Sequence, residues 1–294
     1  MLIIIAGIDP IVSQPLQYFI QRSTANIASM SEAQNLQVFL SGTHSLVGFE
    51  GAPKNVVLDV ISPIKSVSNN FNFNRNRNVL ARNYVGVNMQ HESFGVHSYL
   101  QATLGYNHRL IVGEDASFTF GMGGGICSRN NDYGKLDGIV SDYSIKEIFF
   151  VYRTGIRFEV DRLSVSVFNS DKNYFGEIVW GRLWDNQPSS NDNFYGSDGF
   201  GNEKKGRWNG QLAVLFQQNT ETRANLMRFS ANAVYNDGLG IGISYQTDKD
   251  LSANISLRLS KSLRIGYAYQ LMHLNQLAKK HEIVVRYRLI RDDQ

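Results

Sequence analysis

Residues 96–126 have the sequence VHSYLQATLGYNHRLIVGEDASFTFGMGGGI, which contains two consecutive runs of alternating side chains. In the first run, the residues on one face are Val96, Ser98, Leu100, Ala102, Leu104 and Tyr106. The second run repeats the pattern with Ala116, Phe118, Phe120, Met122, Gly124 and Ile126. Because strand side chains point to alternate faces, each run predicts a strand with one apolar face and one polar face.

Both runs are as long as the roughly 9–11 residues that a tilted strand needs to cross a bilayer. Similar alternation recurs along the chain, so we predict an all-β fold, a transmembrane antiparallel β-barrel of about 14 strands. Its apolar face would meet lipid and its polar face would line the lumen. The expected strands lie at residues 36–42, 54–61, 84–90, 96–107, 116–127, 148–160, 163–167, 175–183, 208–216, 227–235, 239–245, 251–259, 263–271 and 283–289.

Polar segments are expected to connect these strands. We expect loops at Asn69–Asn78, at about 129–143 and at Trp184–Arg207, with tight turns at Asp161-Arg162 and Asn236-Asp237-Gly238. Two long loops, 62–82 and 184–207, fall on the side where short periplasmic turns are expected. Either a strand is miscounted or that side is unusually elaborate.

Composition agrees with a strand-rich membrane protein. The 294 residues include 26 Gly, 5 Pro and 12% aromatics, and no window offers the ~18 apolar residues of a membrane-spanning helix. Lys plus Arg number 29 against 26 Asp plus Glu, a balance that does not indicate a nucleic-acid partner. The one cysteine, Cys127, precludes an internal disulfide and is expected to be a packed thiol.

We expect three parts: a leader or plug segment at 1–35, the barrel at 36–290 and a polar tail at 291–294. Residues 9–35 show neither a clean strand period nor a strong helical one, and would form either a periplasmic leader or a plug inside the lumen. Residues 1–8 are a possible remnant of a signal peptide. Met1–Ala6 is apolar but short, and no basic segment precedes it.

Few residues suggest chemistry. The glycines of Gly121–Gly125 do not open a helix after a strand, so they predict clearance for the amino-terminal segment rather than a phosphate site. His91-Glu92 and His97 lack the spacing of a helical zinc motif and read as interfacial polar residues. We expect no enzymatic activity, cofactor or metal.

Four arginines on the last three strands share the inward face: Arg258, Arg264, Arg286 and Arg288, with Glu282 among them. One interpretation is a solvated lumen wall. The other is a basic strip that holds an acidic or carbonyl-rich segment through forked hydrogen bonds.

Several motifs resemble those of one family, the PorP/SprF membrane proteins of the type IX secretion system. The most distinctive is Gly48-Phe49-Glu50-Gly51-Ala52-Pro53-Lys54. Asn26-Ile27-Ala28 resembles the family's Asn-Pro-Ala, with Ile27 in place of proline. The other similar stretches are Asp9–Gln14, Leu263–Tyr269 and His281–Arg288.

The resemblance implies a bacterial outer-membrane protein that works with the type IX secretion and gliding apparatus of Bacteroidota. It implies large adhesin-like cargo with a type-B C-terminal domain as the partner, and residues 48–54 are candidate contacts. The leading hypothesis is a non-enzymatic barrel that anchors such cargo or assists its export, with lipid and other secretion components as partners. The alternative is a general diffusion porin, which the polar lumen face supports.

Overall fold

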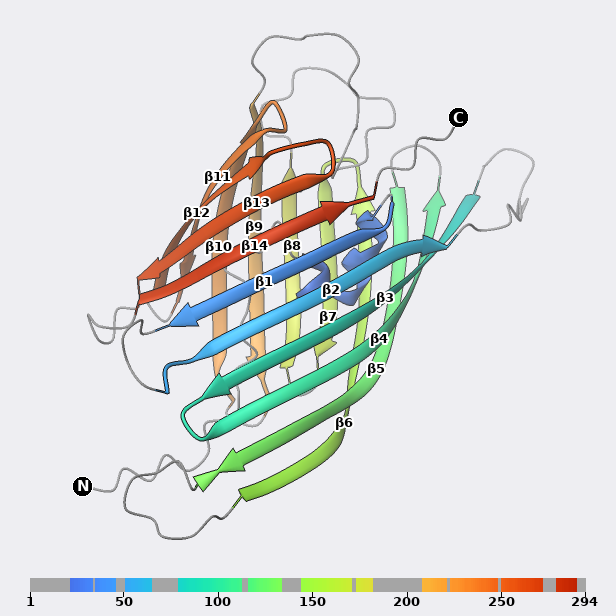
Figure 1. The fold of residues 1–294 in the computed structure, drawn as a ribbon. Coiled ribbons are helices and arrows are strands. Elements are labelled where there is room, and N and C mark those ends of the chain that lie inside the picture. Colours follow the sequence, from blue (N-terminus) through green and yellow to red (C-terminus); the bar gives the residue numbers. More distant parts are fainter. Residues whose placement is uncertain are drawn as a thin grey trace.

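The computed structural model describes residues 22–33, 35–45, 51–64, 79–112, 116–133, 144–170, 173–181, 208–220, 223–247, 250–271 and 279–289. Within these residues, 14 strands form one closed antiparallel barrel, in which each strand pairs with its neighbours in sequence and β1 pairs with β14 (Figure 1). The strands are β1 (Gln37–Ser45), β2 (Lys54–Ile64), β3 (Val79–Phe94), β4 (His97–Val112), β5 (Ala116–Asp132), β6 (Ser144–Val160), β7 (Leu163–Ser170), β8 (Asn173–Gly181), β9 (Trp208–Asn219), β10 (Asn225–Tyr235), β11 (Leu239–Gln246), β12 (Asp250–Arg258), β13 (Leu263–Leu271) and β14 (Lys279–Arg288). The predicted fold class is confirmed.

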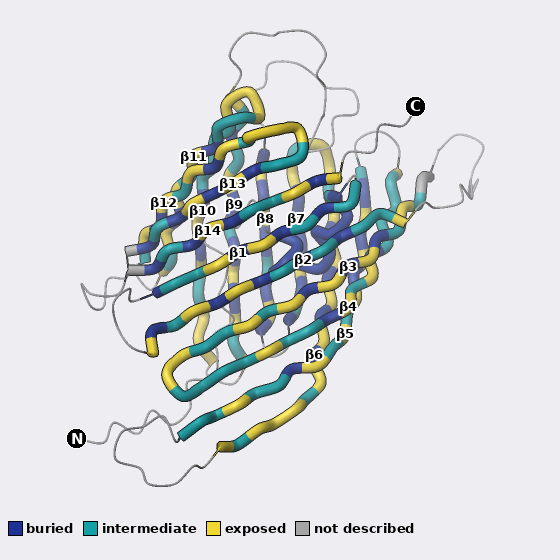
Figure 2. Tube along the Cα trace, in the orientation of Figure 1, coloured by how far each residue is buried: buried dark blue, intermediate teal, exposed yellow. Residues whose placement is uncertain are grey.

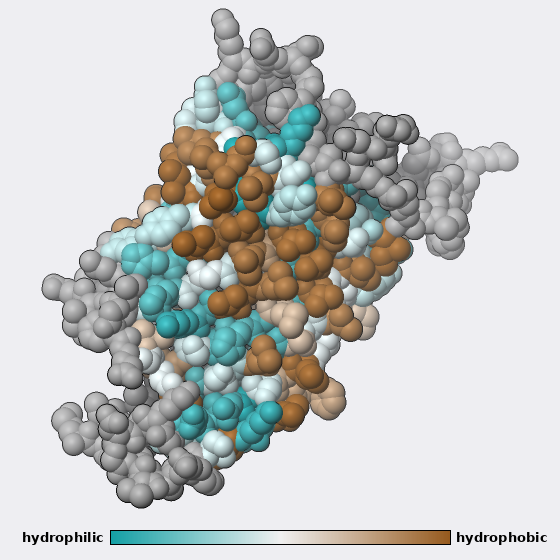
Figure 3. Space-filling model, in the orientation of Figure 1, coloured by the Kyte–Doolittle hydropathy of each residue, from teal (hydrophilic) through white to brown (hydrophobic). Residues whose placement is uncertain are grey.

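The two faces of the wall differ as the alternation predicts. Outward side chains are large and apolar, such as Leu104 and Ile243, which are 68% and 60% exposed. Inward positions include buried polar and charged side chains such as Asp59, Arg157 and Glu177. Figure 2 shows this alternation along the strands, and Figure 3 shows apolar side chains gathered into a broad band across the face in view.

The barrel has two distinct ends. We call the end where β1 begins and β14 ends the terminal end, and the end where residues 46–53 join β1 to β2 the motif end. The two longest gaps between described strands, 65–78 and 182–207, both join strand ends at the terminal end. The predicted placement of the long connections on one side therefore agrees with the strand order, although these connections lie outside the described residues.

Two loop predictions are partly wrong. The ends of the expected loop 62–82 belong to strands, because residues 62–64 continue β2 and residues 79–82 begin β3. Residues 129–132, expected in a loop, continue β5 and pair with Ser144–Glu147 of β6. The reason lies in the side-chain packing, because the Arg129 guanidinium carbon is 5.1 Å from the ring centre of Tyr99 and 5.7 Å from that of Phe149. A cation over two aromatic rings favours an extended backbone in a stretch that is polar in sequence. The tight turns are in place, with positive φ at Asp161, Asn236 and Asp237.

A short helical segment lies inside the barrel, near the terminal end (Figure 1). It consists of the helix α1 (Arg22–Ala25) and the 3₁₀ helix η1 (Ile27–Glu32). No helix in the described part of the chain is long and apolar enough to span a membrane. Ile27 and Met30 pack with three inward side chains of the wall, namely Phe39, Ile61 and Tyr84. The lumen therefore contains an apolar cluster that the simple polar-face rule does not predict.

Glycines on the inward face of β4 and β5 make room for this segment. A Cβ atom on Gly121 would lie 3.0 Å from Ile27 Cγ2 and 3.1 Å from the backbone nitrogen of Ala28. A Cβ on Gly123 would lie 2.7 Å from Ile27 Cδ1. A side chain at either position would force neighbouring atoms to shift, so these lumen-face glycines leave room for the amino-terminal segment, as predicted.

The lipid-facing assignment predicts a large effect of Ile243→Arg, because Ile243 lies outward near the middle of β11. A cation at mid-membrane depth costs about 2–4 kcal/mol in outer-membrane barrels. We expect a loss of that size in the free energy of unfolding in lipid vesicles. The matched change Asn254→Arg, on the inward face of β12, should cost much less, and equal losses would contradict the assignment.

The close approach at Gly121 predicts that Gly121→Val displaces the helical segment, because the added methyl groups meet backbone atoms of Ile27 and Ala28. Overpacking of this kind costs about 1–3 kcal/mol. Amide hydrogen exchange at residues 26–32 should accelerate. The control is Gly124→Val on the outward face of the same strand, where the nearest atom to a new Cβ is Val151 O at 3.8 Å. Unchanged exchange in the Gly121 variant would refute the close packing.

Candidate functional site

Ion pairs of alternating sign join the helical segment to the wall. Arg22 lies 2.7 Å from Glu177 and 2.9 Å from Glu32, and Arg157 bridges Glu32 to Glu159. Arg109 completes the series at 2.8 Å from Glu159. We call these residues the charge chain; in order they are Glu177, Arg22, Glu32, Arg157, Glu159 and Arg109. Three arginines and three glutamates balance one another across β4, β6, β8 and the segment.

The charge chain is buried at its centre. Arg22, Arg157 and Glu177 are 2%, 0% and 1% exposed. Buried charges of this kind are strongly unfavourable unless each one is paired, and removing one partner costs about 3–5 kcal/mol. The charge chain therefore fixes the helical segment to this part of the wall.

Asn26 makes neutral hydrogen bonds at the same place. Its side-chain amide donates to Ser166 at 2.9 Å and to Glu177 at 3.2 Å, and its side-chain oxygen accepts from the Ala28 backbone N–H at 3.0 Å. This last bond caps the start of η1. Asn107 of β4 donates to the backbone carbonyls of Ile27 and Ala28, at 3.1 and 3.0 Å. The stretch Asn26-Ile27-Ala28 therefore both caps η1 and bonds to the barrel wall.

A second set of contacts fixes the other side of α1. Ser23 and Thr24 donate to Asp59 of β2, at 2.8 and 3.4 Å. Arg153 of β6 donates to the backbone carbonyl of Thr24. Contacts from both sides mean that the segment cannot slide along the lumen without breaking buried polar bonds.

The predicted basic strip is present at the terminal end. Arg258, Arg264 and Arg286 are direct cross-strand partners on β12, β13 and β14. Arg258 and Arg264 both bind Asp237 of the β10–β11 turn, and the Arg264 pair is 2.9 Å long. Glu282 is 1% exposed and lies four residues along β14 from Arg286, toward the motif end.

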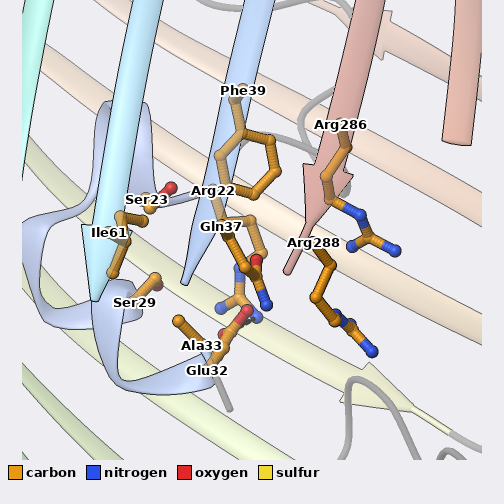
Figure 4. A pocket seen from close by; sticks show the side chains of 10 residues that line it. All are labelled: Arg22, Ser23, Ser29, Glu32, Ala33, Gln37, Phe39, Ile61, Arg286 and Arg288. Carbon is orange, nitrogen blue, oxygen red and sulfur yellow. Dashed lines mark hydrogen bonds and ion pairs between the residues drawn. The ribbon is translucent and has the colours of Figure 1, made fainter. Parts of the chain in front are cut away.

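Two members of the strip lie beside the helical segment. Arg286 and Arg288 line a small pocket together with Arg22 and Glu32, as Figure 4 shows. The remaining lining residues are Ser23, Ser29, Ala33, Gln37, Phe39 and Ile61. The strip and the charge chain therefore meet at this pocket.

The motif at 48–54 lies at the other end of the barrel. Gly48, Phe49 and Glu50 fall outside the described residues. Gly51 has φ +71°, and its carbonyl accepts a hydrogen bond of 2.8 Å from the Gly95 N–H in the β3–β4 turn. Ala52 is buried, and Pro53 leads directly to Lys54 at the start of β2. The structure does not bring this motif and the basic strip together.

Sequence reasoning missed the charge chain. Its wall members were visible as inward-facing ionisable residues, because Arg157 and Glu159 alternate with outward Ile156 and Phe158. Charges inside membrane-spanning segments are expensive and mark functional or structural sites. No group of three or more potential metal ligands occurs among the described residues. Cys127 is buried in the wall, as expected for a packed thiol.

Comparison with known proteins identifies the family. The model described as "Type IX secretion system membrane protein PorP/SprF" matches residues 10–287. No curated protein matches the chain. Similar solved structures include the Acinetobacter baumannii outer membrane protein Omp33 (8% identity, TM-score 0.47, 87% of this chain and 98% of that chain covered). The Ralstonia pickettii toluene transporter TbuX is also similar (8% identity, TM-score 0.48, 91% and 93% covered). With nearly the whole chain matched, this outer-membrane β-barrel belongs to the PorP/SprF family of type IX secretion system membrane proteins.

Proposed function

We propose that this protein is a non-enzymatic barrel that anchors a large adhesin-like cargo at the cell surface or assists its export. We expect this cargo to carry a type-B C-terminal domain. An adhesin of this kind would serve gliding motility. Membership of a type IX secretion family supports this role. One observation favours this role over solute transport: the helical segment lies inside the lumen and is bonded to several strands of the wall.

We infer that residues 1–35 include a plug. The described part of that stretch makes side-chain bonds to β2, β4, β6 and β8 and packs against β1. A diffusion porin needs a continuous aqueous path through the lumen. A segment held by buried ion pairs narrows that path, and this favours a barrel that holds proteins over one that passes solutes.

Two contact surfaces follow from the proposal. The motif at 48–54 would contact partners at the motif end, where Gly51 and the β3–β4 turn already pack together. The long connections at the terminal end would contact other secretion components. Lipid is the partner of the exposed apolar belt.

We also propose that the basic strip binds an acidic or carbonyl-rich segment. Two of its four arginines, Arg258 and Arg264, share the carboxylate of Asp237, whose side chain is 50% exposed. The planar guanidinium group binds carboxylates through paired hydrogen bonds, so further acceptors would suit this cluster of cations. The alternative, a solvated wall, requires no ligand for these cations.

The plug proposal predicts weak conduction. In planar bilayers, the purified wild-type protein should show small or absent single-channel currents. Glu177→Gln should increase channel openings, because Arg22 loses a buried partner and the segment loosens. The control is Glu147→Gln, since Glu147 is 56% exposed and lies 3.8 Å from Arg129. Large, steady currents from the wild type would instead favour the porin.

The anchoring proposal predicts co-purification with cargo. A pull-down from native membranes, read by mass spectrometry, should recover a large secreted protein with a type-B C-terminal domain. Reversing two strip charges, Arg258→Glu with Arg286→Glu, should reduce recovery or disorder the helical segment. Arg162→Glu, in the exposed β6–β7 turn, is the matched control. If recovery and segment order are unchanged, the basic strip has no binding role.

A further inference from the structure

Part of β6 has a free edge. β6 pairs with β5 along its whole length, from Ser144 opposite Asp132 to Val160 opposite Ala116. On its other side it pairs with β7 from Arg153 to Val160 alone. No described strand therefore pairs with the β7-side edge of residues 144–152.

This free edge extends beyond the rim of the neighbouring wall. Arg153 of β6 pairs with Ser170 of β7, Ser170 pairs with Asn173 of β8, and Asn173 pairs with Asn219 of β9. At this row of paired residues β7, β8 and β9 all reach their ends on the motif side. β6 continues past that row toward the motif end, and Figure 1 shows β5 and β6 reaching past the other strands. Residues 144–152 consequently project from the barrel as one side of a hairpin.

The outer face of the projection is apolar. Phe150 is 87% exposed, more than any other large hydrophobic side chain described, and Ile148 is 68% exposed. Ile126, directly opposite Phe150 on β5, is 53% exposed. Figure 3 shows apolar side chains over this part of β5 and β6, apart from the main band.

This apolar face lies beyond the lipid-facing belt. The outward residue near the end of β7 is polar, Asn169, and it pairs with Thr154 of β6. Phe150 and Ile148 lie four and six residues further along β6 than Thr154. A strand edge without backbone partners is not tolerated in hydrocarbon, so bilayer contact does not account for the exposure of these side chains. Exposed apolar patches outside the bilayer mark protein contacts.

We propose that the β6 edge at residues 144–152 is a docking site for an extended segment of another protein, which adds as a strand and covers Ile148 and Phe150. The edge sequence SIKEIFFVY contains neither Pro nor Gly and is rich in β-branched and aromatic residues. Exposed edges of this type accept strands through main-chain hydrogen bonds, while side-chain contacts set specificity. This proposal does not depend on the identity of the cargo.

The side chains along the edge define the chemistry of the partner. An antiparallel partner strand needs small apolar residues at alternate positions opposite Phe150 and Ile148. It needs an acidic residue near its carboxyl end, opposite the exposed Lys146. Lys146 is a residue of the type that keeps edges from pairing unspecifically, so a charge match would select the partner.

A second copy of this chain does not fit the edge. Two identical β6 edges can pair as a ladder when a two-fold axis runs perpendicular or parallel to the strands. Two copies inserted the same way into one membrane are related by an axis along the membrane normal. Barrel strands tilt by about 35–45° from that normal, so the required axes do not coincide.

The test uses the full chain in detergent micelles and a synthetic peptide of alternating threonine and valine with a glutamate near its carboxyl end. We expect the labelled peptide to bind, measured by fluorescence anisotropy, and to slow amide hydrogen exchange at residues 144–152. Phe150→Asn should weaken binding roughly tenfold or more, because the valines of the peptide would no longer bury an aromatic ring. A control peptide with proline at the valine positions should not bind.

A charge exchange keeps the test independent of folding. Lys146→Glu should weaken the glutamate peptide roughly two- to fivefold and strengthen a lysine-ended peptide similarly, as for an exposed ion pair. Equal binding of the proline peptide, or exchange at 144–152 that the peptide does not slow, would overturn the proposal. The proposal would also be overturned if the amides of residues 144–152 were protected from exchange without peptide, because a segment of the same chain would then cover the edge. Dimers that dissociate when peptide is added would overturn it too, because a second copy would then occupy the edge.

Discussion

Hydrocarbon offers no hydrogen-bond partner to a peptide group, and this constraint governs the whole molecule. Each N–H and C=O at membrane depth must be paired within the protein, which a sheet achieves by closing on itself. Here closure joins β1 to β14, the first and last of the described strands. Once the wall is closed, alternation leaves one face for lipid and the other for a lumen in which ionisable groups can be retained.

Because ionisable groups are tolerated on the inward face, the lumen can bind a segment from the amino-terminal part of the same chain. Charge alternates from Glu177 through Arg22 and Glu32 to Arg157, so that each buried ion has an opposite neighbour. Apolar contacts of Ile27 and Met30 and the cap at Asn26 add to the ion pairs. Polar pairing gives the segment one position, and the glycines of β4 and β5 give it the space. Wall and segment therefore specify each other.

Much of this architecture follows from the sequence because side-chain period reports the face of a strand directly. The number of strands, their order and the inward direction of Arg258 and Arg286 were accessible in this way. Period does not give height along the barrel, so it did not show that Arg286 lines a pocket beside the helical segment while Arg258 binds Asp237. Nor could it pair Arg22 with Glu177, which are separated by 155 residues and meet because both lie at one level of the lumen. The continuation of β5 to Asp132 depends on the stacking of Arg129, a contact between three strands.

The enclosed position of the helical segment constrains biogenesis. Arg22–Glu32 precede every strand that the structure describes, yet their partners include Glu177 on β8, and the seam that seals the wall needs β14. A segment synthesised before the described strands thus becomes enclosed by them, and the cylinder has to be completed around it. Threading the segment in afterwards would require carrying Arg22 and Glu32 unpaired past the rim. Assembly therefore favours an intermediate in which the helical segment is already bound inside the barrel while β1 and β14 are not yet paired. A chain lacking its last strand could not form this final pairing.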